Sequence, residues 1–275
     1  MAKSRIEYII NPDGSPGVGW NPVTGCEHSS AFCPIVDDCW ARSYARRFAK
    51  RYRTGFRYQI HWERMTAPLL RHTPTKIGVG FMGDMWADGV PAHWQQEVLR
   101  MIRACPTHTF ICLTKAGHNL PHFEWPPNCW VGVSITGALP EVDRRNLAAL
   151  KQARARVKWV SVEPLLAPWA PDLSGIQWVV VGSLSGPHAR QPQVEWVGDI
   201  MEEAGKRNIT LWLKRNLSPP WAAEDLIQEL PGERRVYLAK VQFAHPDKGG
   251  DEARFKRLQK AYEYIAKVKG QDHKG

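Results

Sequence analysis

The chain has 275 residues, of which 43% are hydrophobic and 23% are charged, and its formal net charge is +10. This length suffices for a domain with a well-buried core and a small appendage, so we expect a globular protein. The sequence contains no apolar run long enough to cross a membrane, and its start lacks the apolar segment of a signal peptide. We therefore expect a cytoplasmic protein without membrane contact.

Three cysteines, Cys26, Cys33 and Cys39, follow a predicted first strand near residues 18–23 with the spacing C-x6-C-x5-C. Three thiolates suit a [4Fe-4S] cluster, because one iron then stays open to a small molecule. With His28 the same thiolates complete a tetrahedral Cys3His zinc site. The spacing alone leaves both metals open.

A strongly basic segment comes next. Residues 39–76 hold ten Lys or Arg and a single acidic residue, Glu63. Apolar residues recur every three or four positions from Ala41 to Tyr52, which predicts an amphipathic helix over 41–58. Such charge attracts polyanions, nucleic acid first, although a solvated helix face is the alternative. The candidate polyanion-binding residues are Arg42, Arg46, Arg47, Lys50, Arg53 and, later in the chain, Lys115.

Short β-rich runs then alternate with helical patterns. Strands are predicted over 76–82, 108–114, 129–135, 157–162, 176–182 and 209–213, and helices over 92–105, 140–154 and 194–207. Most strands are continuous apolar runs, as expected of strands covered on both faces. Six or seven β/α units predict an α/β fold with a parallel sheet, as a full or partial barrel.

Polar residues and glycines follow five of these runs, where parallel sheets bind ligands. They are Gly83, Asp84, Lys115, Ser134, Glu163, Gly182 and Ser185. Ordinary turn chemistry is the alternative for each, and Lys115 and Glu163 suit salt bridges equally well. Trp40, Trp86 and Trp130 are candidates for stacking on a base, with core packing as the alternative.

Six motifs occur in order between about residues 17 and 215, beginning with GWNPVTGCEHSSAFCPIVDDCWARSYARR and continuing with FMGDMWADGVP, FICLTKAG, PPNCWVGVSI, VKWVSVEPLL and WVVVGSLSGPHARQPQVEWV. This series resembles the phage-associated family of radical S-adenosylmethionine (SAM)-like proteins. The resemblance implies a radical SAM-type β/α barrel over residues 1–217 and a [4Fe-4S] cluster on the three cysteines. Both gaps are longer than in the usual C-x3-C-x2-C loop, and the aromatic Trp40 follows the last cysteine instead of preceding it.

The resemblance also implies that SAM binds the open iron through its amino and carboxylate groups, and that an electron donor such as flavodoxin or ferredoxin reduces the cluster. Gly83 and Asp84 would lie near the amino group. Ser134, Glu163, Gly182 and Ser185 would contact the ribose, the carboxylate or the substrate.

Two prolines near residues 217–221 predict a domain boundary, followed by a helical hairpin over 222–275. The tail resembles the centre of a J domain, in which the turn His245, Pro246 and Asp247 would engage an Hsp70 chaperone. Residues 223–230 would form a shortened first helix. A hairpin used only for packing or for substrate binding is the alternative.

Taken together, these features predict a radical SAM enzyme that modifies a nucleic-acid base or a nucleotide in a phage or bacterial context. Two alternatives stay open. One is a non-catalytic, zinc-stapled nucleic-acid-binding protein, which would need His28 as a ligand. The other is a J-domain-type chaperone adaptor on an inactive barrel.

Overall fold

The computed structural model describes residues 1–50, 52, 54–217 and 227–231. The predicted J-domain turn at His245, Pro246 and Asp247 lies outside these residues, as do most of the predicted hairpin and Arg53. The strands of the described part are β1 (Ala2–Lys3), β2 (Val18–Trp20), β3 (Val23–Thr24), β4 (Gln59–Ile60), β5 (Lys76–Val79), β6 (Thr109–Thr114), β7 (Cys129–Ile135), β8 (Val157–Val162), β9 (Trp178–Val181) and β10 (Thr210–Leu213). The helices are α1 (Trp40–Arg47), α2 (Trp62–Met65), η1 (Ala67–Leu70), α3 (Ala92–Ala104), η2 (Gly117–His122), α4 (Pro140–Gln152) and α5 (Val194–Lys206).

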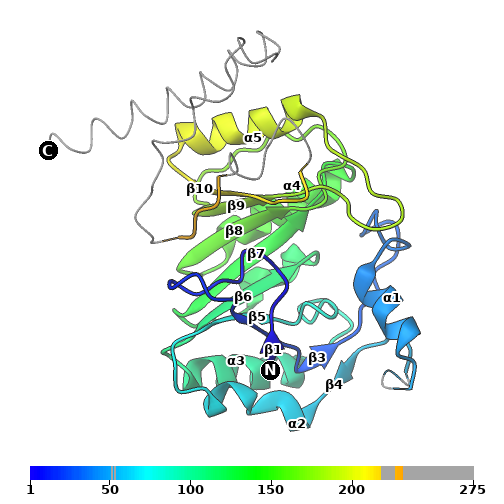
Figure 1. Cartoon of the computed structure of the whole chain (residues 1–275), viewed down its shortest axis with the longest axis vertical. Coiled ribbons are helices and arrows are strands. Elements are labelled where there is room, and N and C mark those ends of the chain that lie inside the picture. The colour runs from blue at the N-terminus through cyan, green and yellow to red at the C-terminus, as the bar shows by residue number, and fades with distance from the viewer. Residues whose placement is uncertain (51, 53, 218–226, 232–275) are drawn as a thin grey trace, which may run out of the picture. The chain divides into compact units, whose positions relative to one another are not determined.

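Eight strands form one mostly parallel sheet in the order β1-β2-β5-β6-β7-β8-β9-β10 (Figure 1). The pairs β2·β5, β5·β6, β6·β7 and β9·β10 are parallel, whereas the short β1 is antiparallel to β2. The order ends at β1 and β10, so the sheet is not closed into a barrel. The predicted α/β fold with a parallel sheet is thus confirmed, and a fully closed barrel is not formed.

The chain divides into two compact units, which we describe separately. Unit 1 comprises Met1–Ile135, Leu139–Ser161 and Gly186–His188. Unit 2 comprises Thr136–Ala138, Val162–Ser185 and the described residues from Ala189 onward.

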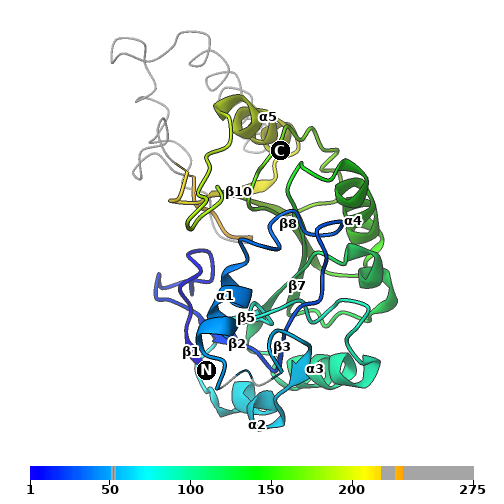
Figure 2. The same cartoon turned by 90° about the vertical axis from the view of Figure 1, so that its right-hand side faces the viewer.

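In unit 1 the strands form because their apolar runs are covered on both faces. Every residue of β5 and of β7 is buried. The buried stripe of α3 includes Val98, Leu99 and Ile102, at the spacing of an amphipathic helix. Figure 2 shows α3 and α4 along the same side of the strands.

Helix α1 is shorter than the sequence predicts. It ends at Arg47, and the predicted continuation to residue 58 is wrong. Only Ala41 and Ala45 of this helix are buried, which gives it a narrow apolar stripe. Beyond the helix the chain turns back, so that Tyr52 packs with Met82 and the carbonyl of Phe56 accepts a hydrogen bond from the Cys26 N–H at 2.9 Å. These tertiary contacts override the local helical pattern.

In unit 2, part of the predicted tail is extended. The N–H of Leu213 donates to the carbonyl of Ile227 at 2.7 Å, and the N–H of Glu229 donates to the carbonyl of Leu211 at 3.0 Å. Residues 227–230 therefore run along β10, and the helix predicted over 223–230 is not formed in this stretch. None of the helices in the described ranges has the length and apolar character required to span a membrane.

Candidate functional site

The loop that carries the first cysteine is held against the carboxyl end of β5 by glycines. Gly25 and Gly83 form a parallel bridge, and the Asp84 N–H donates to the carbonyl of Gly25 at 3.0 Å. A Cβ atom on Gly83 would lie 2.0 Å from that carbonyl oxygen, and Gly25 has φ +99°. Gly83, predicted to bind a cofactor, therefore first serves the close approach of two backbones.

The three cysteines of this loop share one neighbourhood. Cys33 is buried, and Cys26 and Cys39 are half-buried with free thiols. Burial raises the pKa of Cys26 to about 12, and the nearby charges of Asp84, Cys33 and Cys39 add to the rise. Burial also raises the pKa of Cys33, while the positive charge of Lys115 opposes the rise. The charges of Cys33 and Cys39 thus reach Cys26, but no three His, Cys, Asp or Glu side chains in the described part of the chain form a ready metal-binding group.

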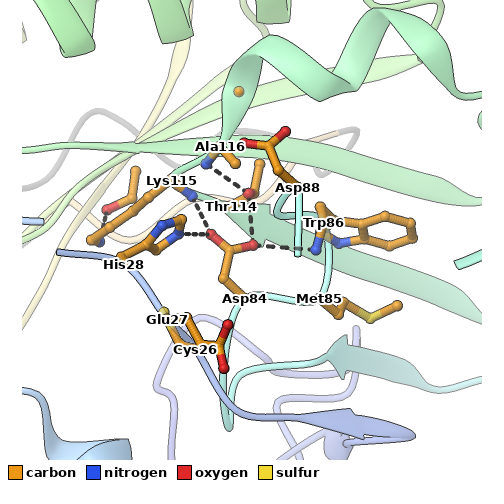
Figure 3. A network of polar contacts seen from close by, with 12 residues as sticks. Cys26, Glu27, His28, Asp84, Met85, Trp86, Asp88, Thr114, Lys115 and Ala116 are labelled. Carbon is orange, nitrogen blue, oxygen red and sulfur yellow. Dashed lines mark hydrogen bonds and ion pairs between the residues drawn. The ribbon is translucent and has the colours of Figure 1, made fainter. Parts of the chain in front are cut away.

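Asp84 is the centre of a hydrogen-bond network (Figure 3). Its Oδ1 accepts from the Thr114 hydroxyl at 2.7 Å and from the Trp86 N–H at 3.3 Å. Its Oδ2 contacts His28 Nε2 at 2.8 Å and accepts from the Lys115 N–H at 2.8 Å. Burial alone would raise the pKa of Asp84, but the contacts with His28, Thr114 and Lys115 lower it below its usual value. The carboxylate is thus fully buried, ionised and occupied by four partners.

This network ties together three segments that are distant in sequence. Asp84 follows β5, Thr114 ends β6, and His28 belongs to the cysteine loop. Since all four contacts of the carboxylate come from the protein, Asp84 positions the loop and the strand ends. It has no free oxygen for the predicted contact with a cofactor amino group.

Lys115 and Ser134 meet beside the cysteines. Lys115 Nζ donates to Ser134 Oγ at 2.6 Å, which joins the ends of β6 and β7. The carbonyl of Lys115 accepts from the side-chain amide of Asn146 in α4 at 2.7 Å. The structure therefore brings together Lys115, Ser134 and Asp84, which the sequence assigned to one site, and the positive charge of Lys115 reaches Cys33.

An aromatic group extends the neighbourhood of His28. The ring of Phe32 stacks on His28 with the centroids 5.5 Å apart, and the Arg145 guanidinium lies 5.0 Å from the centre of Phe32. Phe32 and His118 form a T-shaped pair with the centroids 6.0 Å apart, and His118 Nε2 contacts Asp88 at 2.9 Å. His28 thus contacts Asp84 and Phe32, whereas the zinc alternative required it to complete a site with the three thiols.

The candidates in unit 2 form a second group. Glu163 and Lys214 make a short ion pair between the ends of β8 and β10. A Cβ atom on Gly182 would lie 2.9 Å from Lys214 Cδ and 3.2 Å from Glu163 Cγ, so this glycine leaves room for the pair. Ser185 contacts the Asn216 side chain at 3.0 Å, and the Asn216 amide also bonds to the backbone of Ser183.

The polyanion candidates of α1 differ in environment. Arg42 points inward, since it donates to the Cys26 carbonyl at 3.3 Å and its guanidinium lies 5.5 Å from the centre of the Phe56 ring. Arg46, Arg47 and Lys50 are exposed. Arg42 therefore supports the cysteine loop, and the other three remain accessible to a polyanion.

Two of the three tryptophan candidates pack inside the protein. Trp86 is fully buried against Phe123 and Trp125. Trp130 lies at the start of β7, away from the strand ends, with the Lys76 ammonium 5.4 Å from its ring centre. Trp40 is the exposed one, at 59%.

Sequence reasoning missed several residues of these two groups. Thr114 was treated only as the end of a strand, although a hydroxyl at that point follows the same rule as Asp84. Lys214 directly follows β10 and Asn216 lies two residues further on, so the strand-end rule would have identified both. Phe32 and Arg145 carried no such signal, because their contacts depend on tertiary folding.

Comparisons with curated proteins and with solved structures gave no match. A family model described as "Protein of unknown function (DUF5131)" matches residues 4–245, which is most of the chain. The chain therefore belongs to the DUF5131 family.

Proposed function

We propose that this chain is a radical SAM enzyme in which Cys26, Cys33 and Cys39 hold a [4Fe-4S] cluster, and that its substrate is a nucleic-acid base or nucleotide. The observation that carries the proposal is that Cys26, Cys33 and Cys39 share one loop, which the Asp84 network anchors to the ends of β5 and β6. Loops at this edge of a parallel sheet are where such folds place their chemistry.

The strand order supports a radical SAM-type partial barrel. From β2 to β10 the sheet runs in sequence order, without the reversal of order that marks a doubly wound sheet. In unit 1, α3 and α4 cover the same side of the strands, as helices outside a barrel do (Figure 2). This strand order is the one expected of a partial barrel.

The donor set suits an iron–sulfur cluster in type and number. Three cysteine sulfurs are the ligands such clusters use, and three of them leave one iron open. The thiols sit on a segment of local turns, such as those closed by Cys33 N–H to Ser29 O and by Val36 N–H to Cys33 O, and not on a rigid strand. Such a loop can draw the sulfurs together when the cluster binds.

A cluster held by Cys26, Cys33 and Cys39 would, once reduced, supply one electron for the reductive cleavage of bound SAM, and this cleavage would provide the radical chemistry for hydrogen abstraction from the substrate. The chain's own residues position the cysteine loop and bind the anionic groups of SAM or substrate. Asp84 and His28 hold the cysteine loop, and Lys115 offers a cation beside Cys33 to the carboxylate of SAM or to a phosphate. An electron donor such as flavodoxin or ferredoxin would reduce the cluster.

Anaerobic reconstitution of the full chain tests the cluster. We expect about four irons and four sulfides per chain, and an EPR spectrum of the dithionite-reduced protein that changes when SAM is added. Cys26→Ser, Cys33→Ser and Cys39→Ser should each lose iron, whereas Cys105→Ser, a buried cysteine outside the loop, should retain it. About one tightly bound zinc and no iron would overturn the proposal in favour of a zinc site.

A further inference from the structure

The outer side of α1 carries an unusual row of exposed aromatic rings. Trp40, Tyr44 and Phe48 are exposed to 59%, 39% and 42%, and they lie four residues apart. Residues at this spacing share one face of a helix. Exposure of large apolar rings to water is unfavourable in free energy, so several such rings on one face indicate a binding surface.

The row is held in order by its own contacts. The rings of Tyr44 and Phe48 are 4.5 Å apart at their centroids, and Tyr52 supports Tyr44 edge-on at 6.1 Å. Tyr52 is itself buried with Ala41 and Ala45 under the helix. The Tyr44 and Phe48 rings are thus supported by a packed base, which lowers the ordering cost when a ligand binds.

Positive charge lies on the same short segment as the rings. Arg46, Arg47 and Lys50 are exposed, and the Arg47 guanidinium lies 5.7 Å from the centre of the Phe48 ring. The helix contains no acidic residue in its first turn and ends with two arginines. Aromatic faces together with cations are the combination that binds unpaired nucleic acid, since bases stack on the rings and phosphates pair with the cations.

We propose that the exposed side of α1 and the turn that follows it, formed by Trp40, Tyr44, Phe48, Arg46, Arg47 and Lys50, bind a single-stranded polynucleotide whose bases stack on the three rings. This inference deepens the nucleic-acid substrate of the proposed function and rests on it for its biological meaning, but the binding itself requires no cluster. Bases and phosphates are common to DNA and RNA, so the occupant is defined by being unpaired.

The exposure of the rings favours a single strand over a duplex. The Tyr44 and Phe48 rings are 4.5 Å apart at their centroids, too close for a base to enter between them, so a base can stack only on an exposed ring face. A base inside a duplex already has neighbours on both of its faces. A free strand can extend to meet the rings, but a duplex would have to unstack.

Fluorescence anisotropy with the full, anaerobically reconstituted chain tests this proposal. The probes are a labelled oligothymidylate and an oligouridylate of about 20 nucleotides, which exceed the site size of common single-strand binders, and a duplex of equal length. We expect both single strands to bind more tightly than the duplex. Tyr44→Ala with Phe48→Ala should weaken single-strand binding by about tenfold per ring removed.

Matched variants distinguish the loss of a stacking ring from a general loss of folded structure. Tyr44→Phe keeps the aromatic face and should bind like the wild type. Trp62→Ala removes an equally exposed ring, at 54%, from α2 outside the row and should also bind normally. Arg46→Gln with Arg47→Gln should lower the slope of log affinity against log salt by about 1.4, because each phosphate that is no longer neutralised reduces the slope by about 0.7.

Several results would overturn the proposal. They are equal affinity for duplex and single strand, normal binding by the Tyr44→Ala, Phe48→Ala variant at an unchanged melting temperature, or an equal loss in Trp62→Ala. A change in sedimentation of the double variant without a change in strand binding would assign the row to self-association instead. Iron content and SAM cleavage, measured in the same samples, show separately whether the proposed function fails.

Discussion

Replacement of Asp84 by asparagine tests whether this carboxylate holds the cysteine loop to the strand ends. The amide keeps one acceptor oxygen, and its NH2 group replaces the other. In the wild type each carboxylate oxygen serves one backbone donor, the N–H of Trp86 at Oδ1 and that of Lys115 at Oδ2. Whichever way the amide turns, one buried backbone N–H faces another donor and loses its acceptor.

The hydrogen-bond distances indicate which orientation of the asparagine amide costs less free energy. The Trp86 bond is the longest of the four at 3.3 Å, and the Thr114 hydroxyl can rotate to accept from the new NH2 group. Asparagine should therefore keep the His28 and Lys115 contacts and sacrifice the Trp86 bond. An unsatisfied buried donor costs about 1–3 kcal/mol, so we expect the free energy of unfolding to fall by about 2 kcal/mol. Asp84→Ala leaves all four donors without a partner and should cost roughly 4 kcal/mol or more.

Urea unfolding gives these values, and thermal unfolding should show a drop of about 4–8 °C for Asp84→Asn in a chain of this size. Asp88→Asn is the matched control, because Asp88 contacts His118 and Asn119 with an exposed carboxylate. We expect the control to lose less than about 1 kcal/mol. A loss for Asp84→Asn that is no larger than that of Asp88→Asn would refute the argument.

Three further predictions concern pH, the second group of residues and a glycine of α5. The pKa of Asp84 is lower in the folded protein than in the unfolded chain, where it is about 3.9. The contribution of Asp84 to the free energy of unfolding is therefore fully present above pH 3.9 and is lost as the pH falls through the folded pKa. The stability gap between wild type and Asp84→Asn should therefore be constant from pH 7 to about 5 and narrow below about 4, and a gap that widens on acidification would contradict the assignment. Gly182→Ala should lower the free energy of unfolding by about 1–2 kcal/mol, because the new Cβ atom would clash with Lys214. In a Lys214→Ala background this loss should be smaller. A double-mutant cycle that shows no coupling between the two positions would exclude the clash. Gly198→Ala, a helical glycine with open space around its Cβ position, should instead stabilise by about 0.5–1 kcal/mol.

The strands and the three longer helices could be predicted from the sequence because their signals are local. Runs such as 129–135 are apolar throughout, and the predicted and observed limits of β7 coincide. Helix α1 shows where local periodicity fails. Its pattern continues past Arg47, but the return of Phe56 to Cys26 ends the helix, and that contact joins residues thirty positions apart.

The sequence predicted part of the candidate site, because the ends of parallel strands can be located from the sequence but the partners of their side chains cannot. The rule that polar residues at strand ends are candidate binding residues identified Asp84, Lys115, Ser134 and Glu163. The first three lie in the group around the cysteine loop, and Glu163 lies in the group of unit 2. The rule cannot distinguish a side chain that is free to bind from one that the protein already occupies. Asp84 is fully engaged and Glu163 pairs with Lys214, and only the folded structure shows these partners.

Helix α1 connects the two proposals physically. Its buried side, Ala41 and Ala45, packs with Met82 just beyond β5, and Cys39 packs against the same cluster. Its exposed side begins with Trp40, the residue directly after Cys39. A strand bound along the aromatic row would therefore have one end next to a residue proposed to ligate the cluster. A rigid helix that is anchored on one face and binds on the other can deliver an unpaired base to that place, which an unanchored basic segment could not do.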